Sequence, residues 1–280
     1  MLVTDFIEKG QAHKSITMNT TQLPSTSFFQ SDMWITSVYI FGTFEIVFWL
    51  CNGFLIIIET FDFPSIDKYR IQKHKPKLRF QPDMVKLIIK ETIRHQISTI
   101  LLSPILYYLL TYFGHLEIHG PRPPFQTIVY QLILFILAED AIFFWTHYLF
   151  HTRWLYQNIH KKHHIYKQPT GVVSVLSDPI EGFQNQLSVW FLPVILKEKH
   201  LFTLCIWIVI RVYQTVNAHS GYNLPYIGTQ YWIPWIMPGA LAHDFHHQHG
   251  KWNYGSFFSI WDRLMGTYRQ STTATTKQID

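Results

Sequence analysis

The residues best able to do chemistry in this sequence are histidines, which gather in three short strings in the second half of the chain. The strings are HYLFH at His147–His151, HKKHH at His160–His164 and HDFHH at His243–His247. On an α-helix, residues three and four positions apart lie on one face, so each string is predicted to point its imidazoles the same way. A single HxxxH pair is more often packed or solvated than metal-binding, but three such strings together favour a metal site.

The number of histidines indicates how many metal ions are held. One tetrahedral ion accepts about four ligands, and the three strings contain eight histidines, so two ions are the economical interpretation. A mononuclear site of two histidines and one carboxylate would need only about three ligands. Cys51 and Cys205 both lie in apolar runs, so no thiolate zinc site is expected. Because imidazole binds iron, zinc, copper and nickel alike, the spacing does not choose the metal.

Four residues outside the strings could complete such a centre. His219, in HSGYN, is a predicted ninth nitrogen ligand, and Asn223 could bond a metal-bound water. Glu139 and Asp140 lie in an apolar segment before the first string, where ionisable side chains usually have a role. They are predicted to accept hydrogen bonds from imidazole N–H groups, and the alternative is a place in the headgroup region.

The predicted ligand set follows from these patterns. The predicted metal ligands are His147, His151, His160, His163, His164, His219, His243, His246 and His247. Other histidines and lysines lack matching spacing, and we predict that they are structural or solvated: His200, His249, Lys161 and Lys162.

The elements that must carry these residues are apolar enough to lie in a membrane. Hydrophobic residues make up 48% of the chain and charged residues 15%, against about 25% charged in an ordinary soluble domain. A membrane-spanning helix needs about 20 mostly apolar residues. The apolar segments are 36–58, 97–113, 126–146 and 183–216, the last broken by Lys197–His200 into a predicted helical hairpin. The predicted fold class is all-α: an integral membrane helical bundle with about four membrane-embedded helical regions.

Basic residues predict which side of the membrane the strings occupy. The segment from Asp67 to Arg94 carries nine Lys and Arg residues, which marks it as cytoplasmic. Counting the crossings onward returns all three strings to that side, as a cytoplasmic histidine-rich di-metal cap. The N-terminal tail would then be lumenal, and Asn19 would be a candidate glycosylation site. The net charge of +5 does not indicate nucleic-acid binding, because the basic residues lie in loops beside apolar segments.

The histidine strings match the pattern of a known family. HxxxH, HxxHH and HxxHH mark the fatty acid hydroxylase and sterol desaturase superfamily, which this sequence resembles over about residues 60–270. Within it, the chain looks most like the C-4 methylsterol monooxygenases. Further matching motifs are Glu139-Asp140, Pro169-x-Gly171, Pro179-x-Glu181, HSGYN, Asn253-Tyr254, Trp261-Asp262-Arg263 and Gly266-Thr267. The chain departs from the methylsterol pattern at Asp178, where histidine is usual, and at Tyr268, where aspartate is usual.

The resemblance implies an activity and its cofactors. It implies a membrane-bound di-iron monooxygenase of the endoplasmic reticulum that oxidises the C-4 methyl group of a sterol with dioxygen. Electrons would come from NAD(P)H through cytochrome b5 and its reductase, and other sterol-pathway enzymes would be neighbours. Zinc is the alternative metal in the isolated protein. Two interpretations stay open: hydroxylation of another lipid (a sterol side chain, a fatty acid or a sphingolipid), and a non-catalytic membrane protein that binds metal or sterol.

The resemblance and the apolar segments together divide the chain into four predicted parts. These are a polar tail at 1–34, transmembrane helices with a basic cytoplasmic loop at 35–125, the fatty acid hydroxylase catalytic domain at 126–270, and a disordered tail at 271–280.

Overall fold

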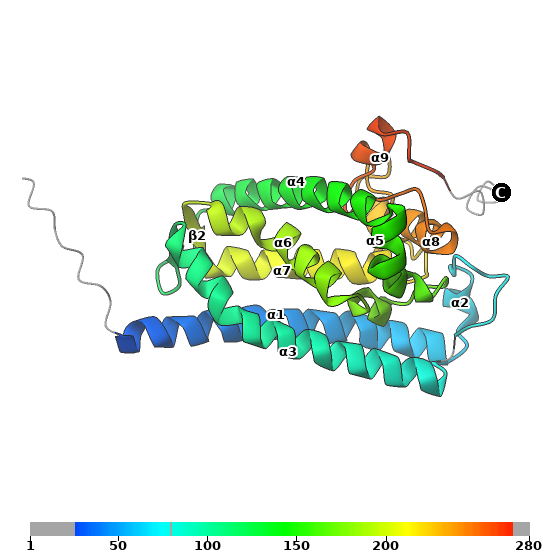
Figure 1. Ribbon diagram of the computed structural model, residues 1–280, viewed down its shortest axis with the longest axis horizontal. Helices are drawn as coiled ribbons and strands as arrows, with labels where there is room; N and C mark the ends of the chain where they lie inside the picture. Colours follow the sequence, from blue (N-terminus) through cyan, green and yellow to red (C-terminus); the bar gives the residue numbers. More distant parts are fainter. Residues whose placement is uncertain (1–25, 79, 271–280) are drawn as a thin grey trace, which may run out of the picture.

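The protein is a bundle of long helices (Figure 1). The computed structural model describes residues 26–78 and 80–270. Within them the long helices are α1 (Thr26–Thr60), α3 (Pro82–Tyr112), α4 (Phe125–Phe150), α6 (Pro179–Ile195) and α7 (Leu201–Ala218). The short helices are α2 (Pro64–Asp67), α5 (Arg153–Asn158), α8 (Gly239–His249), α9 (Ile260–Leu264) and the 3-10 helices η1 (His160–Ile165), η2 (Gly171–Val175) and η3 (Thr229–Tyr231). Strands β1 (His115–Glu117) and β2 (Glu198–His200) form a small parallel sheet, so the chain is mostly helical, with a little sheet that was not predicted.

Proline, aspartate and glycine mark several helix ends. Pro82 and Pro179 stand in the first turns of α3 and α6, where the missing N–H would have no helical partner in any case. Asp178 caps α6, because its side chain accepts a hydrogen bond from Ile180 N at 3.0 Å. Gly250 ends α8 with a φ of 65°, which glycine adopts without strain. The departure from the methylsterol pattern at Asp178 therefore has a structural role.

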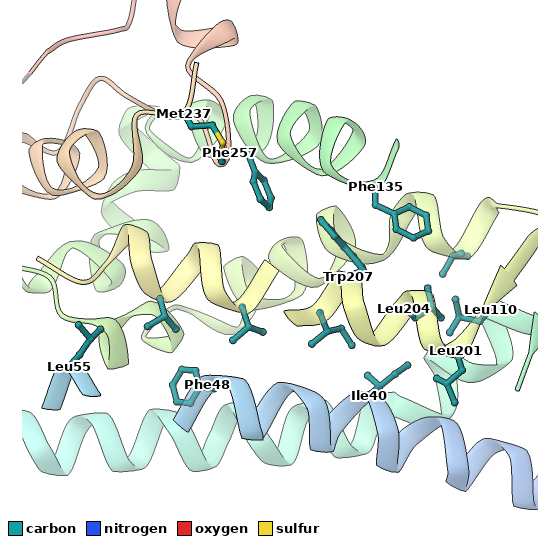
Figure 2. Close-up of a cluster of buried hydrophobic side chains, with 14 of the residues drawn as sticks. Ile40, Phe48, Leu55, Leu110, Phe135, Leu201, Leu204, Trp207, Met237 and Phe257 are labelled. Carbon is teal, nitrogen blue, oxygen red and sulfur yellow. The ribbon is translucent and has the colours of Figure 1, made fainter. Parts of the chain in front are cut away.

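The long helices run alternately in opposite directions between two ends of the bundle (Figure 1). α1 packs against α7 and α3, and α4 packs against α6. Figure 2 shows the core between them, where Phe48 of α1, Phe135 of α4 and Trp207 of α7 are buried. The small sheet, in which His115 pairs with Glu198, lies at one end. The other end holds α2, α5 and α8, so the connections of the bundle are divided between two well-separated ends.

Three of the described helices could cross a membrane by length and composition. They are Ser31–Thr60, Phe125–Phe150 and Leu201–Ala218. Large apolar side chains on these helices face outward, and Leu50 and Phe125, for example, are 71% and 75% exposed. Such a surface is stable in lipid and not in water. Membrane character is thus supported. About four membrane-embedded regions were predicted, and three helices meet these criteria.

The second and fourth predicted segments take a different form from the first and third. Residues 97–113 make up only the second half of α3, whose first half is amphipathic, with Met84 and Ile88 buried and Lys86 and Lys90 exposed. The fourth segment is a hairpin of α6 and α7, joined by β2 where the charged residues interrupt the apolar run. The predicted interruption is therefore the turn of the hairpin.

The predicted terminal parts are described only in part. α1 begins at Thr26, so the predicted polar tail 1–34 is helical from that residue onward. The remainder of that tail, including Asn19, and the predicted disordered tail 271–280 lie outside the described residues.

Candidate metal centre

Nine imidazoles gather at the end of the bundle where α4 meets α5 and α8 (Figure 1). Their ring nitrogens form two groups, and within each group one nitrogen from each ring lies within 4.8 Å of all the others. The first group is His147, His151, His160, His164 and His246, and the second group is His163, His219, His243 and His247. The structure thus brings together all nine histidines predicted as ligands.

Four separate pieces of chain supply these imidazoles. His147 lies in the last turn of α4 and His151 directly follows that helix. The second string forms the 3-10 helix η1, whereas an α-helix was predicted. His219 directly follows α7, and the third string lies in α8. The strings meet because α4 and α7 end at the same end of the bundle and α8 packs against α7 there.

Adjacent histidines within a string face different groups. His163 belongs to the second group and His164 to the first, and His246 and His247 are divided in the same way. The prediction that each string points one way therefore does not hold for the second and third strings. Neighbouring side chains on a helix diverge by about 100°, so an HxxHH string reaches two sites at once.

Backbone carbonyls fix the orientation of five of the rings. In each ring Nδ1 donates to a carbonyl oxygen: His147 to Tyr254 O (2.9 Å), His151 to Gly250 O (3.0 Å), His163 to Leu176 O (3.1 Å), His219 to Thr215 O (2.8 Å) and His246 to Trp252 O (2.6 Å). A carbonyl oxygen can only accept, so each Nδ1 carries the proton of the neutral ring. Each Nε2 is therefore left with a bare lone pair.

These bare Nε2 atoms face Nε2 atoms of other histidines. The Nε2 atoms of His163 and His219 are 3.2 Å apart, and those of His164 and His246 are 3.1 Å apart. His163 and His219 both hold their proton on Nδ1, so neither Nε2 has a proton for the other and their contact is not a hydrogen bond. Lone pairs facing each other in a buried site repel unless a cation lies between them. The donor set therefore fits two metal ions, one in each group.

Burial keeps the imidazoles neutral, as metal ligands must be. His246 and His247 are completely buried. Loss of solvation lowers the pKa of His163 from 6.5 to about 4 and that of His151 to about 2. The same cause holds the pKa of His246 and of His247 well below 6.5. At neutral pH these rings can take up a cation without first releasing a proton.

Glu139 and Asp140 have different partners from those predicted. Glu139 Oε1 lies 2.8 Å from Arg211 Nε of α7. Asp140 Oδ1 accepts a hydrogen bond from Phe257 N at 2.8 Å. In the described structure Glu139 and Asp140 bond to these groups and their neighbours, whereas five imidazole N–H groups donate to backbone carbonyls. The reason is position: both carboxylates lie about two helical turns before His147, so they brace α4 against α7 and the 255–259 loop.

Other predicted residues also have protein partners. Asn223 Oδ1 accepts a hydrogen bond from Gln230 Nε2 at 2.6 Å. His200 caps α7, since its Nδ1 accepts from Phe202 N at 3.0 Å. His249 Nδ1 bonds to a carbonyl of its own helix. The structural roles expected for His200 and His249 match these contacts.

Two carboxylates beside the second string received no role from the sequence. Glu181 Oε1 lies 3.0 Å from His160 Nδ1. Glu91 of α3 lies 2.9 Å from Lys162 Nζ, although Lys162 was predicted to be a solvated residue. The Pro179-x-Glu181 motif was a usable signal for the first contact, whereas nothing in the sequence connects α3 with the second string.

Asp262 supports the first group through a loop. Its carboxylate accepts hydrogen bonds from Tyr254 N (2.9 Å), Gly255 N (2.8 Å) and Thr267 Oγ1 (2.7 Å). The carbonyl of Tyr254 in turn orients His147. The Trp-Asp-Arg motif therefore holds the backbone that positions a candidate ligand.

A cavity of about 50 Å³ lies between the two histidine groups and the helices of the bundle. Imidazoles of both groups line it: His147, His160, His163, His219 and His243. Its other walls come mainly from α4, α6 and α7, and include Phe143, Asn185, Arg211 and Gln214. A reactant in this cavity would touch both groups at the same time.

Comparisons with known proteins place the chain in a family. The model of the fatty acid hydroxylase family matches residues 132–267, which contain all nine histidines. The chain is 34% identical over 240 residues to very-long-chain aldehyde decarbonylase GL1-8 of Oryza sativa subsp. indica, covering 85% of this chain and 86% of that protein. It is 32% identical over 246 residues to methylsterol monooxygenase erg25B of Aspergillus fumigatus (86% and 80% covered).

Another methylsterol enzyme gives the same picture. C-4 methylsterol oxidase erg25 of Schizosaccharomyces pombe is 31% identical over 247 residues, covering 86% of this chain and 79% of that protein. No solved structure matches. The histidine pattern, the two groups it forms and similarity along most of the chain agree, and the chain belongs to the fatty acid hydroxylase family.

Proposed function

We propose that the protein is a membrane-bound di-iron monooxygenase that oxidises the C-4 methyl group of a sterol. The observation that carries the proposal is the pair of histidine groups, whose bare Nε2 atoms converge beside one shared cavity. Membership of the fatty acid hydroxylase family and the methylsterol relatives support a metal-dependent oxidation of a lipid.

Each histidine group would hold one iron ion, the first with five imidazoles and the second with four. When bound, the irons would supply the activation of dioxygen, which an unactivated C–H bond requires and no side chain provides. The same nitrogen donors also accept zinc, so zinc in the isolated protein would be a substitute for iron.

The chain's own residues orient the donors and exclude water. The carbonyls of Tyr254 and Gly250 hold the rings of His147 and His151 in one tautomer. Asp262 fixes the backbone at Tyr254. Because most of the ligand imidazoles are buried, bulk water is kept from the centre, which suppresses side reactions of an oxidising site.

The substrate would reach the cavity from the membrane. α4 and α7, which form two of its walls, are both candidates to span the bilayer. The outer face of α6 exposes Phe183 (64%) and Leu187 (47%). A sterol could therefore lie against apolar helices while its reacting end enters the cavity.

The proposed location is the endoplasmic reticulum membrane, with the histidine groups on the cytoplasmic side. The basic loop that follows α2 lies at the same end of the bundle as α5 and α8 (Figure 1), and such loops favour the cytoplasm. Electrons from NAD(P)H would arrive at this end through cytochrome b5 and its reductase, and other sterol-pathway enzymes would be partners in the same membrane.

A very-long-chain aldehyde is the second candidate substrate. The aldehyde decarbonylase relative is 34% identical to this chain, slightly more than the methylsterol relatives at 32% and 31%. Both candidates would use the same centre, so only the lipid distinguishes them. A non-catalytic metal-binding or sterol-binding protein is disfavoured, because all nine imidazoles are kept in place.

Turnover of defined lipids tests the proposal. The full-length protein in lipid nanodiscs receives NADH, cytochrome b5 and its reductase, together with either a 4,4-dimethyl sterol or a very-long-chain aldehyde. We expect oxidation of the sterol methyl group, dependent on dioxygen and lost in His163→Ala. Conversion of the aldehyde alone would move the assignment to the second candidate. Turnover of neither lipid by the iron-loaded protein would contradict the proposal.

A further inference from the structure

We infer that Asn185 and Ser174 bind an oxygen atom of the lipid substrate, a hydroxyl or carbonyl close to the carbon that is oxidised. The inference rests on the proposed function, because it concerns the lipid that enters the cavity beside the two histidine groups. It adds a selection rule: the site takes lipids with an oxygen near the reacting carbon and rejects plain hydrocarbon at that position.

α6 turns its polar face inward and its apolar face outward. The inward face, at the spacing of one helix side, carries Glu181, Gln184, Asn185 and Ser188, all buried or half-buried. The outward face carries Phe183, Leu187 and Phe191, all exposed. A surface helix of a soluble protein shows the opposite distribution. Beside lipid, polar side chains turned toward the bundle interior mark a site that handles a polar group.

Most polar groups along the cavity already have protein partners. Arg211 Nε is paired with Glu139, and its Nη1 donates to Gln214 Oε1 at 3.0 Å. Gln214 Nε2 donates to Ser256 O at 2.6 Å. The Gln184 amide donates to a hydroxyl of α4. These groups stabilise one another, so they do not need a ligand.

Ser174 and Asn185 differ from those groups. Ser174 Oγ is buried and has no hydrogen-bond partner among the described residues. Asn185 is half-buried and lines the same cavity; its backbone carbonyl accepts a hydrogen bond from Ser188 Oγ (2.8 Å), and among the described residues its side-chain amide makes no hydrogen bond. Glu181, which is 4% exposed, also turns an unpaired Oε2 to this region. Buried polar groups are nearly always paired, so the unpaired oxygens of Ser174 and Glu181, with the half-buried Asn185 beside them on the cavity wall, indicate a polar ligand.

The volume and chemistry of the cavity define that ligand. About 10–15 Å³ of such space holds one water, so about 50 Å³ holds a small functional group and not a whole lipid. Ser174 can donate, and Asn185 can both donate and accept, which matches a hydroxyl or a carbonyl. His160 and His163, one from each group, line the same cavity. An oxygen held there would place its neighbouring carbon beside both groups, as for the 3-hydroxyl of a sterol or the carbonyl of an aldehyde.

Equilibrium binding without turnover tests this inference. Iron-loaded protein in nanodiscs, without reductant or dioxygen, is titrated with two matched pairs: a 4,4-dimethyl sterol and its 3-deoxy analogue, and a very-long-chain aldehyde and the alkane of equal length. In the pair that contains the substrate, we expect the oxygenated lipid to bind at least about tenfold more tightly than its oxygen-free analogue. Asn185→Leu and Ser174→Ala should each reduce this preference about threefold to tenfold, with little change for the oxygen-free member.

A matched control separates the cavity from the helix. Gln186→Leu removes an amide from α6 that bonds Trp190 outside the cavity, and it should leave the preference unchanged. The iron content of each variant checks that the histidine groups are intact, and Ser174→Ala decides the matter if Asn185→Leu does not fold. No preference in either pair, or a preference that survives Ser174→Ala, would overturn the inference. Tighter binding of the oxygenated lipids without any turnover would instead contradict the proposed function and support the roles of Asn185 and Ser174.

Discussion

Glu91 of α3 and Lys162 of the second histidine string form an ion pair of 2.9 Å, in which the Glu91 side chain is only 3% exposed. The same carboxylate lies 2.7 Å from Arg94 Nε, and Arg94 Nη2 donates to Ser177 O at 2.6 Å. Ser177 directly follows the residue whose carbonyl orients His163. α3 therefore holds both the string that contains three candidate ligands and the backbone that aligns one of them.

Lys162→Ala should weaken metal retention without removing a ligand. The lysine is 33% exposed, so solvent screening limits the loss in free energy of unfolding to about 1 kcal/mol. Iron should nevertheless leave faster in competition with a chelator, because η1 loses its contact with α3. Lys161→Ala is the matched control, since Lys161 is an exposed neighbour. Equal iron release from both variants would show that the ion pair does not position the string.

The two histidine groups should differ in their tolerance of a lost imidazole. His151→Ala leaves four donors in the first group, still a full tetrahedral set, whereas His243→Ala leaves three in the second. After gel filtration, elemental analysis should find about two irons per chain in His151→Ala and about one in His243→Ala. The reverse order would refute the division into five and four ligands.

Asp262→Asn should destabilise the loop that orients His147. The carboxylate accepts three hydrogen bonds, and hydrogen bonds to charged groups contribute about 1.5–3 kcal/mol each. Loss of at least one should lower the free energy of unfolding by about 2 kcal/mol and reduce iron in the first group. Denaturation in detergent with parallel iron analysis measures both, and Asp83→Asn, at an exposed site, is the control. An unchanged iron content in Asp262→Asn would show that this loop does not affect metal binding by the first group.

The ligand histidines could be predicted because their spacing is local. Strings such as HYLFH can be recognised without knowledge of the fold, and His219 was added because HSGYN follows the predicted hairpin beside the three strings. The division of His163 and His164 between two groups could not be predicted, because it depends on how η1 sits between α4 and α8. The partners of Glu139 were missed for a similar reason: Arg211 is distant in sequence and lies beside it only after α4 and α7 pack.

Hydropathy predicted the presence of the long helices better than the residues at which they begin and end. The charged break before Leu201 was correctly interpreted as the turn of a hairpin. The first half of α3 was missed, because its apolar residues recur with helical spacing among lysines and do not form an apolar run. Hydropathy alone also did not reveal the polar inward face of the first half of α6, which lies opposite the exposed apolar residues Phe183 and Leu187.

The most direct test of the central claim is the metal content of the wild-type protein purified without oxygen, combined with X-ray absorption at the iron edge. Two groups of converging imidazoles predict about two irons per chain, bound mainly by nitrogen. The absorption spectrum should also show scattering from one iron by the other. One iron or none per folded chain after incubation with ferrous iron, or ligation mainly by oxygen, would contradict it.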